Sequence, residues 1–338
     1  MMDVEAQGTR ASYGTYEILS EIKTKPKKSR LPLLTFVLLL ILVPVGYLFV
    51  FHLPSIQPDH VSVIPDLVRV QNLEEGFLPS HDDKSQLVVV GDIHGMLEPL
   101  EDLLEKVKFK QGRDHLIALG DFTTRGPNSL EVIELLIDLQ ASCVRGNHED
   151  EILHLYAEYH GIPEPGVEGI NESVSGGSKF RVAGADEDDM KLVRSLLPHH
   201  VQYISSCSAI LDMGRVAPKG YKAVACHGGL MWNVDNLQEQ DPTTIMSLRT
   251  LEGDNNEIPS KDKDGVEWMD MWKKTMKQRD KEDRVVVYYG HAAYLGLNIQ
   301  KYTRGHDTGC AKGRSLSASV ITQSKDGSYD NEIVSTKC

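Results

Sequence analysis

Apolar runs alternate with amphipathic segments through the middle of the chain, and this alternation predicts an α/β domain. Short continuous apolar runs indicate buried strands, whereas apolar positions at helical spacing over 96–107 and 130–137 indicate helices. The expected strands are 87–90, 116–119, 142–144, 223–226, 285–289 and 317–322. The first three strands and the two helices alternate along the chain, which predicts right-handed crossovers onto a parallel sheet.

An uncharged apolar segment over residues 31–51 predicts a membrane-spanning helix. At 1.5 Å per residue its length matches the roughly 30 Å core of a bilayer. Lys and Arg residues crowd the preceding flank, 23–30, and are absent from the following one, 52–60. The positive-inside rule then places the N-terminal tail in the cytoplasm and the rest in a lumen. A buried core helix or a cleaved signal peptide is the alternative, although a signal h-region is shorter, about 7–15 residues.

These patterns divide the chain into five expected parts. They are a basic cytoplasmic tail (1–30), a transmembrane signal anchor (31–51), a stalk or linker (52–85), the α/β domain (86–325) and a C-terminal tail (326–338). The cytoplasmic tail contains YEIL at 16–19, which is similar to signals read by sorting machinery. Asn171 begins an N-glycosylation sequon that a lumenal position would make usable.

The charge balance is acidic, and it is uneven along the chain. The 36 Lys and Arg against 49 Asp and Glu give a net charge of −13. Residues 1–51 hold six basic and four acidic side chains, so the remainder holds 30 and 45, a net charge of −15. Such a chain lacks the basic surface of a nucleic-acid binder. Five cysteines give neither a disulfide framework nor a zinc ribbon, and Cys143, Cys226 and Cys310 are expected to be small buried residues.

Five of the expected strands end in a short polar motif. The motifs are GDIHG (91–95), GDFTTRG (120–126), GNHE (146–149), HGG (227–229) and GHA (290–292). Ligands of open α/β sheets bind beyond the carboxyl ends of the strands, so all five motifs are expected at one rim. One such motif arises by chance, whereas five in order indicate a functional site.

The residue types at this rim predict a dinuclear metal centre. The expected ligands are Asp92, His94, Asp121, Asn147, His227 and His291. Carboxylate, imidazole and amide groups suit Zn²⁺, Mn²⁺, Fe²⁺ or Co²⁺. Two such ions can hold a hydroxide and clamp the attacking and leaving oxygens at phosphorus. Arg125 can bind a phosphate oxygen, and His148 can face the leaving group as a general acid.

The motif series resembles the calcineurin-like metallophosphoesterases. The intervals from Asp92 to Asp121 and from Asp121 to Asn147, 29 and 26 residues, are similar to those of the phosphoprotein-phosphatase branch. The sequence DTGCAKGRSL at 307–316 resembles a turn of that branch. Within the branch the chain is similar to bacterial diadenosine tetraphosphatases and to membrane-anchored fungal zinc-dependent endopolyphosphatases of the vacuole. The resemblance covers about residues 86–322, and the anchor with its basic tail matches the second group.

This resemblance implies a metallophosphoesterase fold, with a two-sheet β-sandwich core flanked by helices and preceded by one transmembrane helix. It implies an endopolyphosphatase that hydrolyses internal phosphoanhydride bonds of inorganic polyphosphate with a metal-activated hydroxide. The metals would be two Zn²⁺ ions, with Co²⁺ or Mn²⁺ as alternatives. The chain would be a single-pass type II protein with its catalytic domain in the vacuole.

The resemblance also implies individual roles. Asp92, His94 and Asp121 would hold one metal, and Asp121 with Asn147, His227 and His291 the other. Arg125 and Asn147 would contact phosphate oxygens, and His148 would be the acid. Arg249 is either a second phosphate-binding arginine or a surface arginine of a helix.

One position departs from the protein phosphatases, which carry Asp immediately before the arginine. Thr124 stands there, and a neutral side chain is expected neither to orient His148 nor to raise its pKa. This favours a substrate with a better leaving group, such as a phosphoanhydride. The alternatives are a diadenosine tetraphosphatase, a serine/threonine protein phosphatase and an inactive anchored phosphate-binding receptor.

Overall fold

The protein divides into two units, which a computed structural model describes over residues 31–47, 61–169 and 186–338. The first unit, Met1–Pro58, holds α1 (Leu31–Tyr47), a helix of 17 residues with Pro44 inside it. Among the described residues, no helix combines the length and the apolar character that crossing a membrane requires. The structure therefore does not show the predicted span.

Several predicted features lie outside the described residues. They are the tail over 1–30 with its YEIL sequence, positions 48–51 of the predicted span, and the sequon at Asn171. They stay predictions.

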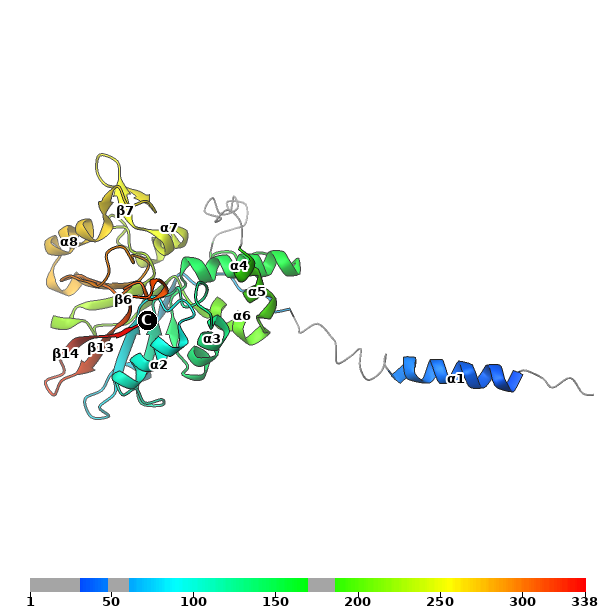
Figure 1. The fold of residues 1–338 in the computed structure, drawn as a ribbon. Coiled ribbons are helices and arrows are strands. Elements are labelled where there is room, and N and C mark those ends of the chain that lie inside the picture. The colour runs from blue at the N-terminus through cyan, green and yellow to red at the C-terminus, as the bar shows by residue number, and fades with distance from the viewer. Residues whose placement is uncertain (1–30, 48–60, 170–185) are drawn as a thin grey trace, which may run out of the picture. The chain divides into compact units, whose positions relative to one another are not determined.

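The second unit, Asp59–Cys338, contains three β-sheets (Figure 1). The six-stranded sheet has the order β1 (Val70–Asn72), β5 (Ile210–Asp212), β6 (Lys222–Cys226), β10 (Val285–Tyr289), β12 (Thr303–Gly305) and β11 (Asn298–Ile299). The five-stranded sheet has the order β14 (Tyr329–Lys337), β13 (Ser315–Gln323), β2 (Gln86–Val90), β3 (His115–Ala118) and β4 (Ser142–Cys143). The small sheet has the order β8 (Ile258–Ser260), β7 (Thr250–Glu252) and β9 (Val266–Glu267).

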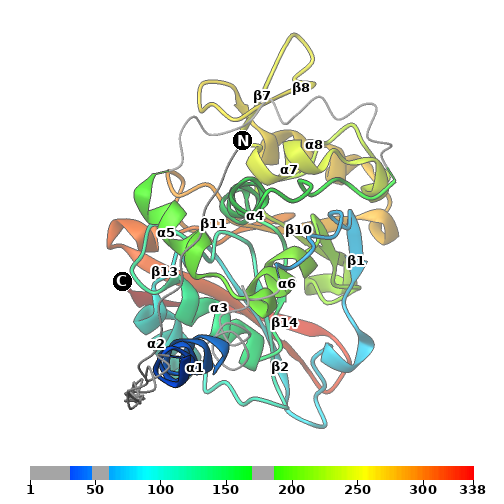
Figure 2. The same cartoon turned by 90° about the vertical axis from the view of Figure 1, so that its right-hand side faces the viewer.

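Seven α-helices and several 3₁₀ turns connect the described strands of this unit. The helices are α2 (Leu97–Lys106), α3 (Ser129–Asp138), α4 (Asn147–His160), α5 (Glu187–Ser195), α6 (Pro198–Ser206), α7 (Pro242–Ser247) and α8 (Trp268–Gln278). The 3₁₀ turns are η3 (Glu75–Phe77), η5 (Pro218–Gly220), η6 (Leu237–Glu239), η7 (Lys281–Asp283) and η8 (Cys310–Lys312). Residues of α2, α3 and α6 share one hydrophobic cluster with the five-stranded sheet. Figure 2 shows α3 between α2 and α6.

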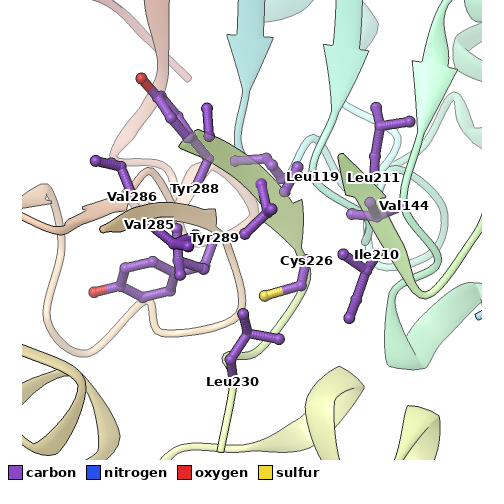
Figure 3. Packing of buried hydrophobic residues seen from close by; sticks show 14 of the residues in the cluster. Leu119, Val144, Ile210, Leu211, Cys226, Leu230, Val285, Val286, Tyr288 and Tyr289 are labelled. Carbon is purple, nitrogen blue, oxygen red and sulfur yellow. The ribbon is translucent and has the colours of Figure 1, made fainter. Parts of the chain in front are cut away.

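The continuous apolar strands are buried on both faces. In β2, Leu87 and Val89 point into a core shared with the six-stranded sheet, whereas Val88 and Val90 point into the core under the helices. The alternation follows from the two-residue period of a strand. Figure 3 shows the shared core, with Leu119 on the side of the five-stranded sheet and Val286 of β10 among its other members. The mixed α/β fold with two packed sheets agrees with the prediction.

Both ends of this unit extend beyond the predicted domain, 86–325. β1 lies in the segment interpreted as a stalk, yet it pairs in parallel with β5. β14 lies in the predicted C-terminal tail, yet it pairs with β13 along nine residues. The compact unit therefore begins at Asp59 and ends at Cys338.

Two disulfides correct the expectation for the cysteines. Cys143 bonds to Cys207, and Cys310 bonds to Cys338; Cys226 is buried and free. The first bond links β4 to the end of α6 across 64 residues of chain. The second holds the last residue against η8. Disulfides persist in oxidising compartments, so these two bonds favour an oxidising environment for the domain.

Replacement of both Cys143 and Cys207 by Ser is expected to lower the free energy of unfolding by about 2–4 kcal/mol, because the bond restricts a long loop of the unfolded chain. Denaturant unfolding of the variant and of the wild type measures the difference. When the denaturant unfolding is repeated with a reductant, the free energies of unfolding of the wild type and the variant should become more similar. Identical midpoints for the oxidised wild type and the variant would show that the bond contributes nothing.

Candidate active site

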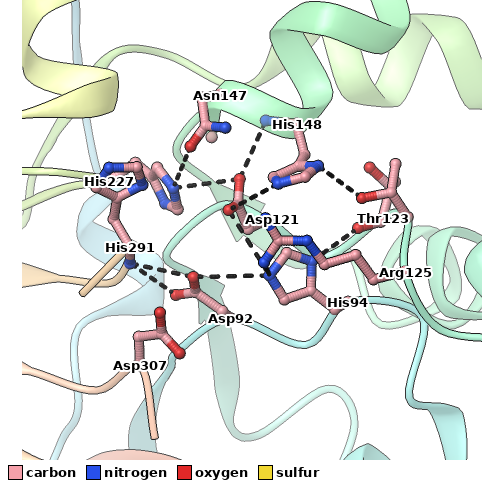
Figure 4. Close-up of polar contacts among 12 residues, drawn as sticks. Asp92, His94, Asp121, Thr123, Arg125, Asn147, His148, His227, His291 and Asp307 are labelled. Atoms are coloured by element: carbon pink, nitrogen blue, oxygen red, sulfur yellow. Dashed lines mark hydrogen bonds and ion pairs between the residues drawn. The ribbon is translucent and has the colours of Figure 1, made fainter. Parts of the chain in front are cut away.

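The strand-end motifs meet at one rim, formed by the carboxyl ends of β2, β3, β4, β6 and β10 (Figure 4). The structure gathers eight predicted residues there: Asp92, His94, Asp121, Arg125, Asn147, His148, His227 and His291. The ninth, Arg249, precedes β7 and lines the same cavity. All nine residues predicted for this site are therefore close to one another, and their chemical roles follow as proposals.

Asp121 occupies the middle of the group. Its Oδ1 lies 3.2 Å from His227 Nε2 and accepts a hydrogen bond of 3.1 Å from the backbone N–H of His148. Its Oδ2 lies 3.8 Å from His94 Nε2. Asp121 belongs to two groups of possible metal ligands, one with His94 and His148 and the other with His227 and His291. Within each group, the possible ligand atoms lie within 4.8 Å of one another. Asp121 could therefore bridge two ions, as predicted.

The histidine rings are held so that Nε2 faces the carboxylate. His94 Nδ1 lies 3.2 Å from the carbonyl oxygen of Thr123, and His227 Nδ1 lies 2.7 Å from that of Leu119. A carbonyl oxygen only accepts, so each Nδ1 carries a proton and the Nε2 of each ring faces Asp121. Burial also lowers the pKa of His94 to about 4, which keeps that ring neutral. A lone pair beside a carboxylate oxygen favours a cation between them.

His291 and Asp92 form the other side of the site. The backbone N–H of His291 donates to both carboxylate oxygens of Asp92, at 3.0 and 3.1 Å. The Nε2 of His291 is buried and has no hydrogen-bond partner within the described structure. A Cβ on Gly290 would lie 2.1 Å from Asp92 Oδ1, so only glycine permits this approach. The unpartnered nitrogen points to a ligand at this place.

The backbone of the site is strained. Five motif residues adopt positive φ angles: His94 at 51°, Asp121 at 49°, Thr124 at 66°, Arg125 at 64° and His291 at 65°. Each such conformation costs on the order of 1–3 kcal/mol in a residue other than glycine, and the surrounding structure must enforce it. The strain therefore identifies the rim as a place where side-chain position matters more than stability.

The donor set fits the dinuclear metal centre that the motif resemblance implies. Asp92, His94 and Asp121 could hold one ion, and Asp121, Asn147, His227 and His291 the other. Burial acts to lower the pKa of His227, but the Asp121 carboxylate outweighs it and the pKa is raised. The same negative potential favours a divalent cation. When bound, the two ions would supply Lewis acidity at the phosphate and an activated water molecule.

Glu149 supports the site from beneath, a role that the sequence analysis missed. It is fully buried, and its two carboxylate oxygens accept from four donors. The donors are Asp121 N at 2.7 Å, Thr123 N at 3.0 Å, Thr123 Oγ1 at 2.7 Å and Gly146 N at 3.1 Å. The last position of the GNHE motif was the available signal. Glu149 thus fixes the backbone of two motifs at once.

Asp307 is a second buried carboxylate that received no role from the sequence. It lies beside Asp92 and lines the cavity (Figure 4). Burial raises the pKa of Asp92, and the charges of Asp307 and Asp121 raise it further. A cation bound nearby would favour the charged forms of these three carboxylates. The DTGC sequence was the signal that could have placed Asp307 here.

Thr124 contacts His148, which corrects one expectation. Its Oγ1 lies 2.8 Å from His148 Nδ1, so the neutral side chain does orient the ring. Thr124 was also expected not to raise the pKa of His148. This agrees with the structure, because burial lowers the pKa of His148 below its ordinary value. The hydroxyl of Thr124 therefore stands where protein phosphatases carry the Asp carboxylate, and it orients His148 without supplying a negative charge.

Replacement of Thr124 by Asp is expected to raise the pKa of His148 and to improve catalysis on poor leaving groups. The ratio of kcat/KM on a phosphoserine peptide to that on tripolyphosphate should rise about tenfold. Thr124→Val is the matched control, since it removes the hydroxyl and adds no charge. An Asp variant whose substrate ratio equals that of the Val variant would contradict this role of position 124.

A cavity of about 260 Å³ opens above these residues. Arg125 and Arg249 line it together with Asp92, Asp121 and Asn147. Arg249 lies close enough that its charge contributes to the lowered pKa of His148, after burial, Arg125 and His227. Of the two alternatives for Arg249, the structure favours a residue of the site over a surface residue.

A third cluster lies away from the rim and is explained by hydrogen bonds. The Nε2 atoms of His199 and His200 lie 2.8 and 2.6 Å from Glu134 Oε1. His200 Nδ1 accepts the backbone N–H of Leu197, so the proton of a neutral ring sits on Nε2. That nitrogen donates to Glu134 and has no lone pair for a metal.

The chain is similar to known proteins over most of its length. The family model described as calcineurin-like phosphoesterase matches residues 85–308. A zinc-dependent endopolyphosphatase of Saccharomyces cerevisiae is 24% identical over 307 residues, which cover 86% of this chain and 91% of that protein. A symmetrical bis(5'-nucleosyl)-tetraphosphatase of Coxiella burnetii is 27% identical over 271 residues, 68% of this chain and 86% of that protein.

A solved structure described as a diadenosine tetraphosphatase superposes with a TM-score of 0.58 at 27% identity, over 80% of this chain and 98% of that one. Fold, site geometry and sequence model thus lead to one assignment. The chain belongs to the calcineurin-like phosphoesterase family and is a hydrolase.

Proposed function

We propose that the protein is a metal-dependent endopolyphosphatase, which hydrolyses internal phosphoanhydride bonds of inorganic polyphosphate with two zinc ions. The observation that carries the proposal is the cavity itself, whose floor consists of metal-ligating groups and whose walls carry cationic side chains. Such a cavity suits a substrate that is phosphate along its whole length. The similarity to the yeast zinc-dependent endopolyphosphatase supports the same substrate.

In the proposed reaction, water attacks a phosphorus atom of the polyphosphate, and the bond between that phosphorus and the bridging oxygen breaks. Arg125 and Asn147 bind the phosphate oxygens, on which charge builds up. His148, oriented by Thr124, gives a proton to the departing phosphate. A phosphate chain is a good leaving group and depends little on that proton, which agrees with the low pKa of His148.

A dinucleoside tetraphosphatase is the second candidate, because relatives and a similar structure carry that description. A nucleobase binds best against a free aromatic ring. Within the described part of the chain, Tyr294 is the one Tyr, Phe or Trp that lines the cavity. Its hydroxyl donates to Glu267, and Lys263 Nζ lies 5.1 Å from the centroid of its ring. A ring engaged in this way favours polyphosphate over a dinucleoside.

The two disulfides support a lumenal catalytic domain, since such bonds persist in oxidising compartments. This agrees with the charge flanks of residues 31–51, which predict a cytoplasmic tail. The membrane anchor, the vacuolar location, the sorting of the tail and glycosylation of Asn171 remain parts of the proposal.

The proposal is tested with the purified chain, Zn²⁺ and three substrates: long-chain polyphosphate, diadenosine tetraphosphate and a phosphoserine peptide. Gel analysis should show long polyphosphate shortened through intermediate lengths, at a higher kcat/KM than for either other substrate. Release of single phosphates from the ends would contradict an internal cut. Turnover of the peptide alone would assign the site to a protein phosphatase.

A further inference from the structure

Two lysines line the same cavity as the metal-ligating residues and have no place in the proposed reaction. Lys263 lies in the segment between β8 and β9, and Lys312 ends η8. Both side chains are exposed. They come from segments 49 residues apart in sequence, so the fold brings two independent walls to one opening.

The backbone under each lysine is held in place. Beside Lys263, the carbonyl oxygen of Lys261 accepts from Arg249 Nη1 at 2.9 Å, and that of Asp262 accepts from Thr250 Oγ1 at 2.8 Å. The wall that carries Lys263 is thereby fixed to an arginine of the site.

Lys312 lies in a turn closed by short hydrogen bonds. Its N–H donates to Gly309 O at 2.9 Å, and Gly313 N donates to Cys310 O at 2.8 Å. The disulfide from Cys310 to Cys338 ties this turn to the end of the chain. Both lysines therefore stand on ordered backbone.

Among the described residues, neither ammonium group has an acidic partner, and the contact of Lys263 Nζ with the Tyr294 ring, 5.1 Å to the centroid, leaves the lysine charge without a counterion. Among the residues that the structure describes, Lys263 and Lys312 form no ion pair. Asp262 and Asp264 flank Lys263 in sequence, but neither lines the cavity. Two unpaired cations thus face an opening whose acidic groups, Asp92, Asp121 and Asp307, belong to the floor.

We infer that Lys263 and Lys312 bind phosphates on either side of the cleaved linkage and select long linear polyanions. This inference rests on the proposed function and names the feature of the substrate that the walls recognise. Lysine suits this task, because its flexible ammonium follows a mobile chain without the fixed geometry of arginine. A substrate with few phosphates occupies the floor and leaves one wall or both unused.

The test is the double variant Lys263→Gln/Lys312→Gln of the full chain. Steady-state kinetics compare polyphosphate of about one hundred phosphates with tripolyphosphate. Two lost contacts between exposed charges should raise KM for the long chain about tenfold. The rise for tripolyphosphate should be at most about threefold, and kcat should carry little of either effect. The matched control is Lys274→Gln/Lys277→Gln on α8, which removes the same charge from exposed positions outside the cavity.

Salt dependence gives a second readout that a merely structural role does not change. Salt weakens the binding of a polyanion, and the slope of log affinity against log salt concentration grows with the number of protein cations that contact the polyanion. The double variant should therefore show a shallower slope of log KM against log salt for the long chain than the control. Equal KM values and slopes in the two variants, with a wild type that cuts polyphosphate, would overturn the inference alone. A wild type that cleaves phosphomonoesters and not polyphosphate would overturn the proposed function together with it.

Discussion

Asp121→Asn is expected to lower kcat about a thousandfold or more while the domain stays folded. The carboxylate belongs to both sets of possible metal ligands, and its oxygens lie 3.2 Å from His227 Nε2 and 3.8 Å from His94 Nε2. Asparagine keeps the shape, but it removes the charge that both ions would share. Loss of several kcal/mol of metal-assisted stabilisation corresponds to about this factor in rate.

The measurement is kcat on polyphosphate, with a thermal melt by circular dichroism on the same sample. Asp102→Asn on α2 is the matched control, because it makes the same chemical change at an exposed position. The control should keep wild-type turnover. An Asp121 variant with more than about a tenth of the wild-type rate would be too active for a bridging ligand.

Glu149→Gln is expected to lower the free energy of unfolding by about 3 kcal/mol, one of the largest effects of a single isosteric change in this domain. The carboxylate accepts four hydrogen bonds from buried donors, three of them from the backbone N–H groups of Asp121, Thr123 and Gly146. Glutamine presents an NH₂ group to some of these donors and leaves them without an acceptor, at about 1–3 kcal/mol for each buried group. The melting temperature should fall by about 6–10 °C.

Denaturant unfolding and melting of Glu149→Gln measure this, with Glu158→Gln at an exposed position of the same helix as the control. Turnover should fall too, because the backbone that presents Asp121 loses its support. Equal melting temperatures of the two variants would mean that the four hydrogen bonds contribute no net stability.

The gathering of the site was predictable because its residues follow strands that were easy to recognise. Val88 and Val90 belong to a continuous apolar run, and such runs identify strands buried on both faces. Parallel strands end at the same edge, so Asp92 and Asp121 had to approach each other once both strands were placed. The apolar runs that precede the motifs were therefore enough to predict that the motifs lie together.

Other parts of the fold depend on partners that the sequence does not show. The nine residues of β14 lie at the edge of a sheet, where six are half-buried and three are exposed, and they lack an apolar run, so the sequence alone indicates a polar tail. β1 has three residues and becomes a strand through its pairing with β5. The disulfides join cysteines that are 64 and 28 residues apart, and only the fold brings those pairs together.

The supporting residues of the site were missed for a similar reason. Glu149 contacts backbone groups of a distant motif, and Lys312 approaches the cavity from a turn after the last motif. Thr124 was recognised as a departure, but a hydroxyl 2.8 Å from His148 Nδ1 could not be foreseen from its neutral charge. Ligand types are visible in a sequence, whereas hydrogen bonds between distant segments require the structure.

The central claim is a two-metal centre bridged by Asp121, and metal content tests it most directly. The full chain, loaded with Zn²⁺ and freed of excess metal, is analysed by inductively coupled plasma mass spectrometry beside the Asp121→Asn variant. We expect about two zinc ions per wild-type chain and a clear loss in the variant. One ion or none per wild-type chain, or two retained by the variant, would contradict it.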